Sequence, residues 1–429
     1  MSVRNHELYH EQDLRVPMTH LNLVFHGAGI QQEPESMCGL ARFTAKMLFR
    51  GAGSLTREEI SRRFDLLGAE VSAHVSETDF LVAVSCITKN LDAVLDLLVT
   101  VLNEASFPGA ELELLKKSEL NVLEGAFQDP ERVLSAAHLY VLYDGRNLGK
   151  IGSRGGIDKI SRKDLVDYFR SVRSASVLYF TAISDLSRSG VEHAVERFTI
   201  GRLSEGFSLK GELPFKESAA RAAYIVESKE AKNDRLIWSQ EGISATDEKR
   251  FGLNLIIDAL GSFEGYLFDE LRNKKGWCYG AYAFVTPATN RPGRIGFYAD
   301  PSSESSKDLI PALLQLLESF PDEEGFRNRL KERNEAFKNR YAYQLDLKYR
   351  LGSRVHKDRY GIPILSRDEY NARIDGVTAE AARRIIGEVF DLNRLVMVFH
   401  GDVDRIKSTL TGLDASIPVT VLEKDLLVA

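Results

Sequence analysis

The sequence contains an internal repeat, and this repeat constrains the fold more than any other feature. The segment 157–185 aligns without a gap with the segment 374–402, at a constant offset of 217 residues. In each copy a Ser or Thr stands where a helix N-cap belongs, an amphipathic helix follows, and a strand of buried type ends in Ser-Asp or Gly-Asp. A repeat at about half the chain length indicates two homologous domains.

A weaker repeat pairs residues 64–73 with residues 272–281, at an offset of 208. Together the offsets predict an N-terminal domain over residues 1–205 and a homologous C-terminal domain over residues 220–429. The stretch that joins them has glycine and proline among charges, which is typical of a linker. The expected fold class is α+β, with two tandem α/β domains, each a mixed and mostly antiparallel sheet with helices packed on one face.

Apolar periodicity predicts further helices over residues 38–50, 56–67, 90–105, 109–126, 130–143, 248–260, 263–275, 305–319 and 322–348. The last of these helices opens a basic region. Between Phe326 and Arg359 the sequence has eleven Lys or Arg and four Asp or Glu. One interpretation is a solvated helix face opposite a buried aromatic stripe. The alternative is a basic wall that faces an acidic partner or peptide.

The composition excludes several classes of protein. The chain has 429 residues, of which 44% are hydrophobic and 28% charged, as in ordinary globular proteins. The net charge of -6 does not favour nucleic acid or anionic lipid as a partner. Three cysteines without paired spacing indicate neither a disulfide framework nor a cysteine-based zinc site. Neither a secretory signal nor an apolar run of about 18 residues is found, so we expect a cytoplasmic protein.

A possible metal motif stands near the N-terminus. His6-Glu7-Leu8-Tyr9-His10 matches H-E-x-x-H, in which two His one helical turn apart bind zinc. Only five residues precede His6, Pro17 follows soon after, and no third ligand stands at a suitable spacing. A chance match is the favoured interpretation, and an independent zinc site at His6 and His10 is the alternative.

Two segments at matching places in the halves remain. Residues 39–51 read Gly-Leu-Ala-Arg-Phe-Thr-Ala-Lys-Met-Leu-Phe-Arg-Gly, and residues 267–280 read Leu-Phe-Asp-Glu-Leu-Arg-Asn-Lys-Lys-Gly-Trp-Cys-Tyr-Gly. On spacing alone, Arg272 is a surface cation and Tyr279 a strand aromatic. Together with the duplicated halves, however, these segments resemble the pitrilysin/insulinase-type metallopeptidases, or inverzincins, which include relatives of the mitochondrial processing peptidase. The resemblance covers nearly the whole chain.

The resemblance implies a degenerate zinc site in the first half. In the family the first helix reads Gly-Leu-Ala-His-Phe-x-Glu-His, where two His bind zinc, the Glu activates water, and a Glu on a later helix completes the site. Here Arg42 replaces the first His, Ala45 the Glu and Lys46 the second His. Cationic Arg and Lys offer no lone pair to a metal, so we expect no metal in this chain. Glu119 and Glu124 are the candidates for the later Glu.

The resemblance also implies that Arg272 and Tyr279 are functional, because they match an Arg/Tyr pair that faces the zinc across a closed chamber in relatives. A Tyr hydroxyl can donate to a developing oxyanion, and an Arg can hold a peptide carbonyl or carboxylate. The chain therefore resembles the zinc-less subunit of a heterodimeric peptidase, half of a clamshell. It would be inactive alone, with zinc in a His-x-x-Glu-His partner subunit and a peptide as substrate. The alternative is a non-catalytic structural or recognition subunit, like the core proteins of the respiratory cytochrome bc complex.

Overall fold

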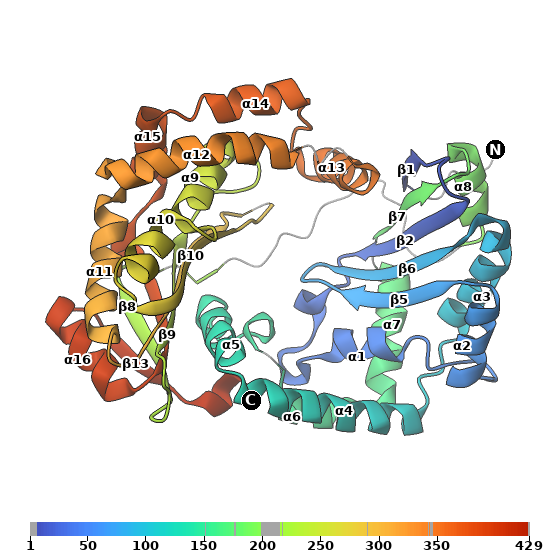
Figure 1. The fold of residues 1–429 in the computed structure, drawn as a ribbon. Coiled ribbons are helices and arrows are strands. Elements are labelled where there is room, and N and C mark those ends of the chain that lie inside the picture. The colour runs from blue at the N-terminus through green and yellow to red at the C-terminus, as the bar shows by residue number, and fades with distance from the viewer. Residues whose placement is uncertain are drawn as a thin grey trace.

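A computed structural model describes residues 7–150, 152–175, 177–198, 215–216, 218–289, 291–341, 343 and 346–427. It shows two halves, each built on one β-sheet (Figure 1). The predicted linker lies largely outside the described residues. The strands are β1 (Glu7–Gln12), β2 (Met18–His26), β3 (Gly51–Ala52), β4 (Leu55–Thr56), β5 (Glu70–Val75), β6 (Asp79–Ile87), β7 (Val177–Ser184), β8 (Ala222–Glu227), β9 (Arg235–Glu241), β10 (Cys278–Thr286), β11 (Arg294–Pro301), β12 (Val396–Gly401) and β13 (Val419–Leu422).

The helices follow the same order in both halves. In the first half they are α1 (Leu40–Met47), α2 (Arg57–Leu66), α3 (Leu91–Glu104), α4 (Gly109–Gln128), α5 (Pro130–Leu142), α6 (Arg154–Lys159), α7 (Arg162–Ala175) and α8 (Arg188–Val195). In the second half they are α9 (Arg250–Gly261), α10 (Tyr266–Phe268) with the π-helix η5 (Asp269–Asn273), α11 (Ser306–Ser319), α12 (Glu324–Tyr341), α13 (Leu347–Tyr360), α14 (Arg367–Asp375), α15 (Ala379–Val389) and α16 (Val403–Leu413). Each first-half helix has a second-half counterpart.

The two sheets share one topology. The first sheet has the order β1-β7-β2-β6-β5, and the second has β10-β11-β9-β12-β8-β13. Read from its other end, the second sheet repeats the first, with β13 added beside β8. β1 is parallel to β7 in the first sheet, and the equivalent β8 is parallel to β12 in the second. The added β13 is also parallel to β8. The other neighbouring strands of both sheets pair antiparallel. The duplication seen in the sequence is therefore a duplication of the whole α/β unit.

Side-chain alternation along the strands gives each sheet two apolar faces. In the first sheet Leu23, Phe25 and Phe80 point into the core that the helices of the same half complete. Tyr9 and Tyr179 point to the opposite face. The second sheet has the same arrangement, with one face in the core of its own half and the other in a separate apolar cluster.

The opposite face of each sheet is covered by a helix from the other half. Val133, Leu134, Ala137 and Val141 of α5 pack against the second sheet. Conversely, Leu351 and Val355 of α13 pack on Tyr9, Val24 and Tyr179 of the first sheet. Since α5 and α13 are equivalent in the two repeats, this is a reciprocal exchange of one helix, visible in Figure 1 as α5 below and α13 above the space between the halves.

Ion pairs reinforce the docking of α13. Arg350 and Arg354 both bind Glu11 of β1, at 2.9 and 2.7 Å, and Arg359 binds Glu7 at 2.6 Å. Within the second half, the basic side chains of α12 also pair internally, Arg333 and Arg340 with Asp258 and Lys338 with Asp375. Much of the positive charge in this region is therefore used inside the chain.

The predicted helix over residues 322–348 is wrong in extent. The structure has α12, which ends at Tyr341, and a new helix, α13, which begins at Leu347. The Asp346 carboxylate accepts a hydrogen bond from the backbone N–H of Lys348, so Asp346 is the N-cap of the second helix. The prediction missed this cap inside a charged, continuously periodic stretch.

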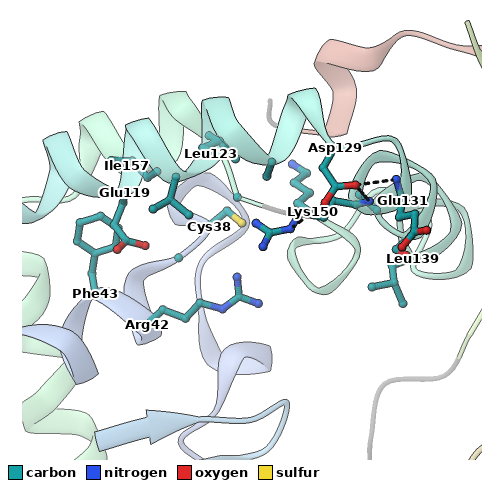
Figure 2. A pocket seen from close by; sticks show the side chains of 17 residues that line it. Cys38, Arg42, Phe43, Glu119, Leu123, Asp129, Glu131, Leu139, Lys150 and Ile157 are labelled. Carbon is teal, nitrogen blue, oxygen red and sulfur yellow. Dashed lines mark hydrogen bonds and ion pairs between the residues drawn. The ribbon is translucent and has the colours of Figure 1, made fainter. Parts of the chain in front are cut away.

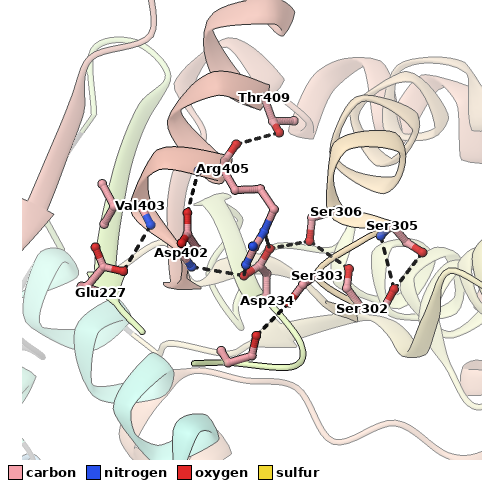
Figure 3. A network of polar contacts seen from close by, with 11 residues as sticks. Glu227, Asp234, Ser302, Ser303, Ser305, Ser306, Asp402, Val403, Arg405 and Thr409 are labelled. Carbon is pink, nitrogen blue, oxygen red and sulfur yellow. Dashed lines mark hydrogen bonds and ion pairs between the residues drawn. The ribbon is translucent and has the colours of Figure 1, made fainter. Parts of the chain in front are cut away.

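A buried carboxylate ties the strands of the second half to two of its helices (Figure 3). Asp234 is 1% exposed and accepts two hydrogen bonds from the Arg405 guanidinium, at 2.9 and 2.7 Å. It also accepts one from the hydroxyl of Ser306, at 2.6 Å. A side chain at Gly401 would collide with Asp234, which explains glycine at that position.

Among the described residues, no helix combines the length and the apolar character that crossing a membrane requires.

Candidate functional site

Helix α1 carries the three positions of the degenerate zinc motif, and a buried carboxylate fixes its start. Glu33 accepts hydrogen bonds from the backbone N–H groups of Gly39, at 2.9 Å, and Ala41, at 2.7 Å. Burial raises the pKa of Glu33 to about 6, and the two backbone donors partly oppose this shift. Gly39 has φ +99°, a conformation that favours glycine.

The helix presents Arg42 and Lys46 one turn apart on its exposed side, while Ala45 is buried. The ammonium of Lys46 binds the carboxylate of Glu119 on α4, with 2.7 Å between Nζ and Oε1. The other candidate glutamate, Glu124, instead pairs with Arg154 at 2.8 Å. Of the two candidates, only Glu119 therefore contacts a motif residue, and its carboxylate is paired with the ammonium of Lys46.

A cavity of about 520 Å³ lies beside this ion pair, between α1, α4 and α5 (Figure 2). Its lining includes apolar side chains from all three helices, with Arg42 and Glu119 at one side. Cys38 also lines it, and burial raises the pKa of its thiol to about 11, so the thiol is protonated at neutral pH.

The donor set at this place does not fit zinc. Two of the three motif positions carry cations, and the third is an alanine. Within the described part of the chain, His, Cys, Asp and Glu side chains form no group of three that could hold a metal ion. The side chains at these three positions are therefore not suited to hold zinc.

The second candidate site, with Arg272 and Tyr279, lies in the other half. Arg272 belongs to the π-helix η5, in which the N–H of Lys274 bonds to the carbonyl of Asp269, five residues back. Isolated π-turns are frequent at functional sites. The π-helix ends at Asn273. Gly276 follows with φ +67°, and the N–H groups of Gly276 and Trp277 bond back to the carbonyls of Arg272 and Leu271, which closes the turn after the helix.

A β-bulge presents Tyr279. The register of β10 against β11 shifts between Cys278 and Ala281, so one extra residue is accommodated there. The buried carboxylate of Asp300 on β11 accepts the backbone N–H of Gly280 at 2.6 Å, which holds the bulge. Burial raises the pKa of Asp300. The side chain of Tyr279 is 70% exposed as a result.

Arg272 and Tyr279 form one unit. The guanidinium of Arg272 donates to the backbone carbonyl of Tyr279 at 2.6 Å. It also lies over two aromatic rings, 4.8 Å from the centre of the Phe268 ring and 4.6 Å from that of Tyr279. The pair thus offers an oriented cation and an exposed hydroxyl, which suit a peptide carbonyl and an oxyanion.

The structure brings Arg272 and Tyr279 together but keeps them apart from the degenerate motif. Helix α1 and strand β10 lie in different halves, on opposite sides of the central space (Figure 1). Among the hydrogen bonds and ion pairs of the described residues, none joins Arg42 or Lys46 to Arg272 or Tyr279. The two candidate sites are therefore separate in this chain.

The N-terminal H-E-x-x-H match has no helical context. Residues Glu7–Gln12 form strand β1, where residues four apart are about 13 Å from each other. His10 is buried in that strand, and His6 lies outside the described residues. This geometry agrees with a chance match.

Sequence reasoning missed Glu33 and Asp300, the two buried carboxylates that position the candidate sites. Glu33 lies six residues before Gly39, the N-cap of α1, and Asp300 is the last but one residue of a strand that is apolar in its inner positions. Neither has a sequence signal of its own. For Asp300, the acidic residue in an otherwise apolar strand is at most a weak sign of a functional or structural role, because buried carboxylates are rare.

Comparison with known proteins agrees with this architecture. Residues 12–149 match the family model described as Insulinase (Peptidase family M16), and residues 159–328 match the one described as Peptidase M16 inactive domain. The two matches together span most of the chain, and the chain belongs to peptidase family M16. The expected family and the expected fold of two α/β domains are thereby confirmed.

Individual relatives are distant in sequence. A Bacillus subtilis protein described as an uncharacterized zinc protease, YmxG, is 20% identical over 68% of this chain and 71% of its own length. The mitochondrial-processing peptidase subunit beta of Caenorhabditis elegans is 22% identical over 68% of this chain and 65% of its own length. In structure, a peptidase M16 inactive domain from Pseudomonas fluorescens superposes with a TM-score of 0.78 at 19% identity, over 93% of this chain and 97% of that one.

Proposed function

We propose that this chain is a cytoplasmic, zinc-less subunit of a heterodimeric zinc metallopeptidase, inactive alone, which completes the site of a zinc-binding partner with Arg272 and Tyr279. The partner would be a homologous subunit with an intact His-x-x-Glu-His motif. It would supply the zinc and the water that the metal activates. The substrate would be a peptide.

The contrast between the two sites carries this proposal. Where a metal would need ligands, the chain has the ion pair between Lys46 and Glu119. Where a peptide would need an oriented donor and cation, the chain has Tyr279 in a bulge and Arg272 beside it. A π-helix, the hydrogen-bonded turn at Gly276 and the buried Asp300 all serve to hold this second pair. Because three separate features hold Arg272 and Tyr279 in place, we infer that the pair has a function in substrate binding.

The pair would act on the substrate and not on the metal. The exposed phenol of Tyr279 can donate to the oxygen of a scissile carbonyl as negative charge develops there. Arg272 can bind a neighbouring peptide carbonyl while its contacts with Phe268 and Tyr279 keep it in place. The names of two relatives, each a subunit beta of a mitochondrial-processing peptidase, support an assembly of more than one chain.

Peptide hydrolysis by the chain alone, by a co-expressed His-x-x-Glu-His homologue alone and by their mixture tests this proposal. We expect activity in the mixture, with zinc confined to the homologue. Replacing Tyr279 by Phe should lower turnover by about 100-fold without preventing assembly, as expected on removal of one oxyanion donor. Tyr343→Phe is the matched control, because Tyr343 is 74% exposed and lies outside β10.

Two results would contradict the proposal. Stoichiometric zinc and hydrolysis in the isolated chain would show that it is itself a peptidase. Full activity of an assembled complex that carries both Arg272→Gln and Tyr279→Phe would show a structural or recognition subunit instead.

A further inference from the structure

We infer that a groove beneath α13, away from both candidate sites, binds a ligand that joins a carboxylate to an aromatic or large aliphatic group. The groove has a volume of about 650 Å³ and lies between α9, α12, α13 and α14, with the loop 361–365 at one end. Figure 1 shows these helices together at the top of the second half. A volume of this size is in the range of small-molecule sites.

Aromatic rings form the wall of the groove. The Tyr341 and Tyr370 rings stack with their centres 3.8 Å apart, and Phe337 continues the stack at 6.3 Å from Tyr370. Phe251 meets Tyr370 edge to face at 5.9 Å. Tyr349 lines the same groove from α13 and is 56% exposed. Tyr341 and Tyr370 are 9% and 7% exposed, so an apolar or aromatic group of a ligand would pack mainly on the ring of Tyr349.

The charged groups of the lining are all basic. Arg250 and Lys348 line the groove with His356, and no Asp or Glu is among the described lining residues. In that part of the chain, neither Arg250 nor Lys348 forms an ion pair with a carboxylate, in contrast to Arg350, Arg354 and Arg359 on the same side of the molecule. These two cations are thus available to an anion from outside.

Arg250 is held in a position suited to that role. Its guanidinium lies 4.2 Å from the centre of the Phe251 ring, and it donates a long hydrogen bond, 3.4 Å, to the carbonyl of Asp247. Burial lowers the pKa of Arg250, which shows that the charge is partly desolvated. A partly desolvated guanidinium gains from a carboxylate partner, since such charge-assisted hydrogen bonds are stronger than neutral ones.

The two features together define the ligand. Aromatic walls alone would accept any apolar compound, and cations alone would accept any anion. Their combination in one groove selects a compound with both parts, such as a free aromatic acid or a peptide that ends in an aromatic residue. The inference does not depend on the proposed peptidase role, because the groove is built by this chain alone.

Isothermal titration calorimetry on the full chain tests the inference. The probes are N-acetyl-phenylalanine, its neutral amide, and N-acetyl-glycine, which lacks the ring. We expect saturable binding of N-acetyl-phenylalanine, with the amide and the glycine compound each at least about tenfold weaker, as loss of a charge-assisted bond or of ring packing implies. A tripeptide that ends in Phe distinguishes the two sources, since only a peptide ligand would gain further affinity from its additional residues.

Variants of exposed lysines on α13 locate the binding. Lys348→Gln should weaken N-acetyl-phenylalanine about three- to tenfold and leave the amide unchanged. Lys357→Gln is the matched control, because Lys357 lies on the same helix and outside the groove lining. Equal affinity for the acid and its amide, absence of saturable binding, or equal effects of the two lysine variants would overturn the inference.

Discussion

Lys46 and Glu119 form an ion pair between α1 and α4, with 2.7 Å between nitrogen and oxygen. Lys46 stands where the family resemblance expects a zinc-binding His, and Glu119 is one of the two candidates for the later Glu. The ammonium of Lys46 thus neutralises the carboxylate of Glu119. This ion pair links α1 to α4 through side chains of the chain itself.

This relationship predicts that a metal site can be restored. The double change Arg42→His and Lys46→His places two imidazoles one helical turn apart, with the Glu119 carboxylate released from Lys46. Three such ligands suffice for zinc. We expect close to one equivalent of zinc in the double variant, measured by elemental analysis after dialysis.

The control for zinc restoration is a triple variant that also carries Glu119→Gln, which should lose the metal. The same triple variant with Glu124→Gln in place of Glu119→Gln should keep it. Zinc retained after loss of Glu119 would show that α4 does not contribute a ligand.

The bulge at Tyr279 predicts a positioning role for Asp300. Asp300→Asn removes one acceptor from the carboxylate that holds the N–H of Gly280, so the bulge should relax. In the complex with a zinc-binding partner, we expect kcat to fall about tenfold while KM and assembly change little. Asp308→Asn, an exposed acidic residue in the first turn of α11, should have no effect. A fall in thermal stability with unchanged kcat would assign Asp300 a structural role alone.

Glu33 predicts a pH dependence of stability. Its pKa rises from 4.5 in the unfolded chain to about 6 in the fold, so between these values the folded state holds a proton that the unfolded state has released. The free energy of unfolding therefore falls as the pH rises through this window, by about 2 kcal/mol in total. Glu33→Gln cannot titrate and should lack this fall. Urea unfolding of both proteins at pH 4 and pH 7 measures the difference, and parallel behaviour would refute the assignment.

A buried histidine links the two halves and predicts a large loss of stability. His138 of α5 shares a 2.7 Å hydrogen bond with the hydroxyl of Ser239 on β9, and Arg294 donates to the same hydroxyl at 3.0 Å. Burial lowers the pKa of His138 to about 3, so the ring is neutral at pH 7. His138→Ala should cost about 2–4 kcal/mol, because it leaves a cavity and removes one of the two hydrogen bonds of the buried Ser239 hydroxyl.

Thermal unfolding at pH 7 measures the loss. His193→Ala is the comparison, since the side chain of His193 is 85% exposed and its removal should leave the melting temperature unchanged. Equal stability of the two variants would mean that the contact between α5 and β9 contributes nothing.

The sequence predicted those parts of the fold that local pattern and repetition determine. The offset of 217 residues places β7 over β12 and α7 over α15, and the structure has these elements in equivalent positions. Most helices lie within a few residues of their predicted ranges, because caps such as Thr56 and apolar periodicity are local signals. The Arg272 and Tyr279 pair was found through resemblance and not through spacing, since a π-helix and a bulge have no periodic pattern.

The exchange of helices could not be predicted in the same way. The stripe of Val133, Leu134, Ala137 and Val141 shows that α5 has a buried face, but any apolar sheet could cover it. The choice of the second sheet depends on contacts about 100 residues apart, such as His138 with Ser239. The split between α12 and α13 was missed for a related reason, because a single Asp346 cap competes with a long charged periodic stretch.

The exchanged helices change what counts as a folding unit in this chain. Without α13, Tyr9, Val24 and Tyr179 would leave an apolar patch on the first sheet open to water, and without α5 the second sheet would have the same fault. A duplication that made two copies of a domain has therefore left neither copy self-sufficient. In evolutionary terms the halves depend on each other. A gene fission at the predicted linker would yield two fragments, each with an exposed apolar sheet face, and we expect them to be soluble only after they associate.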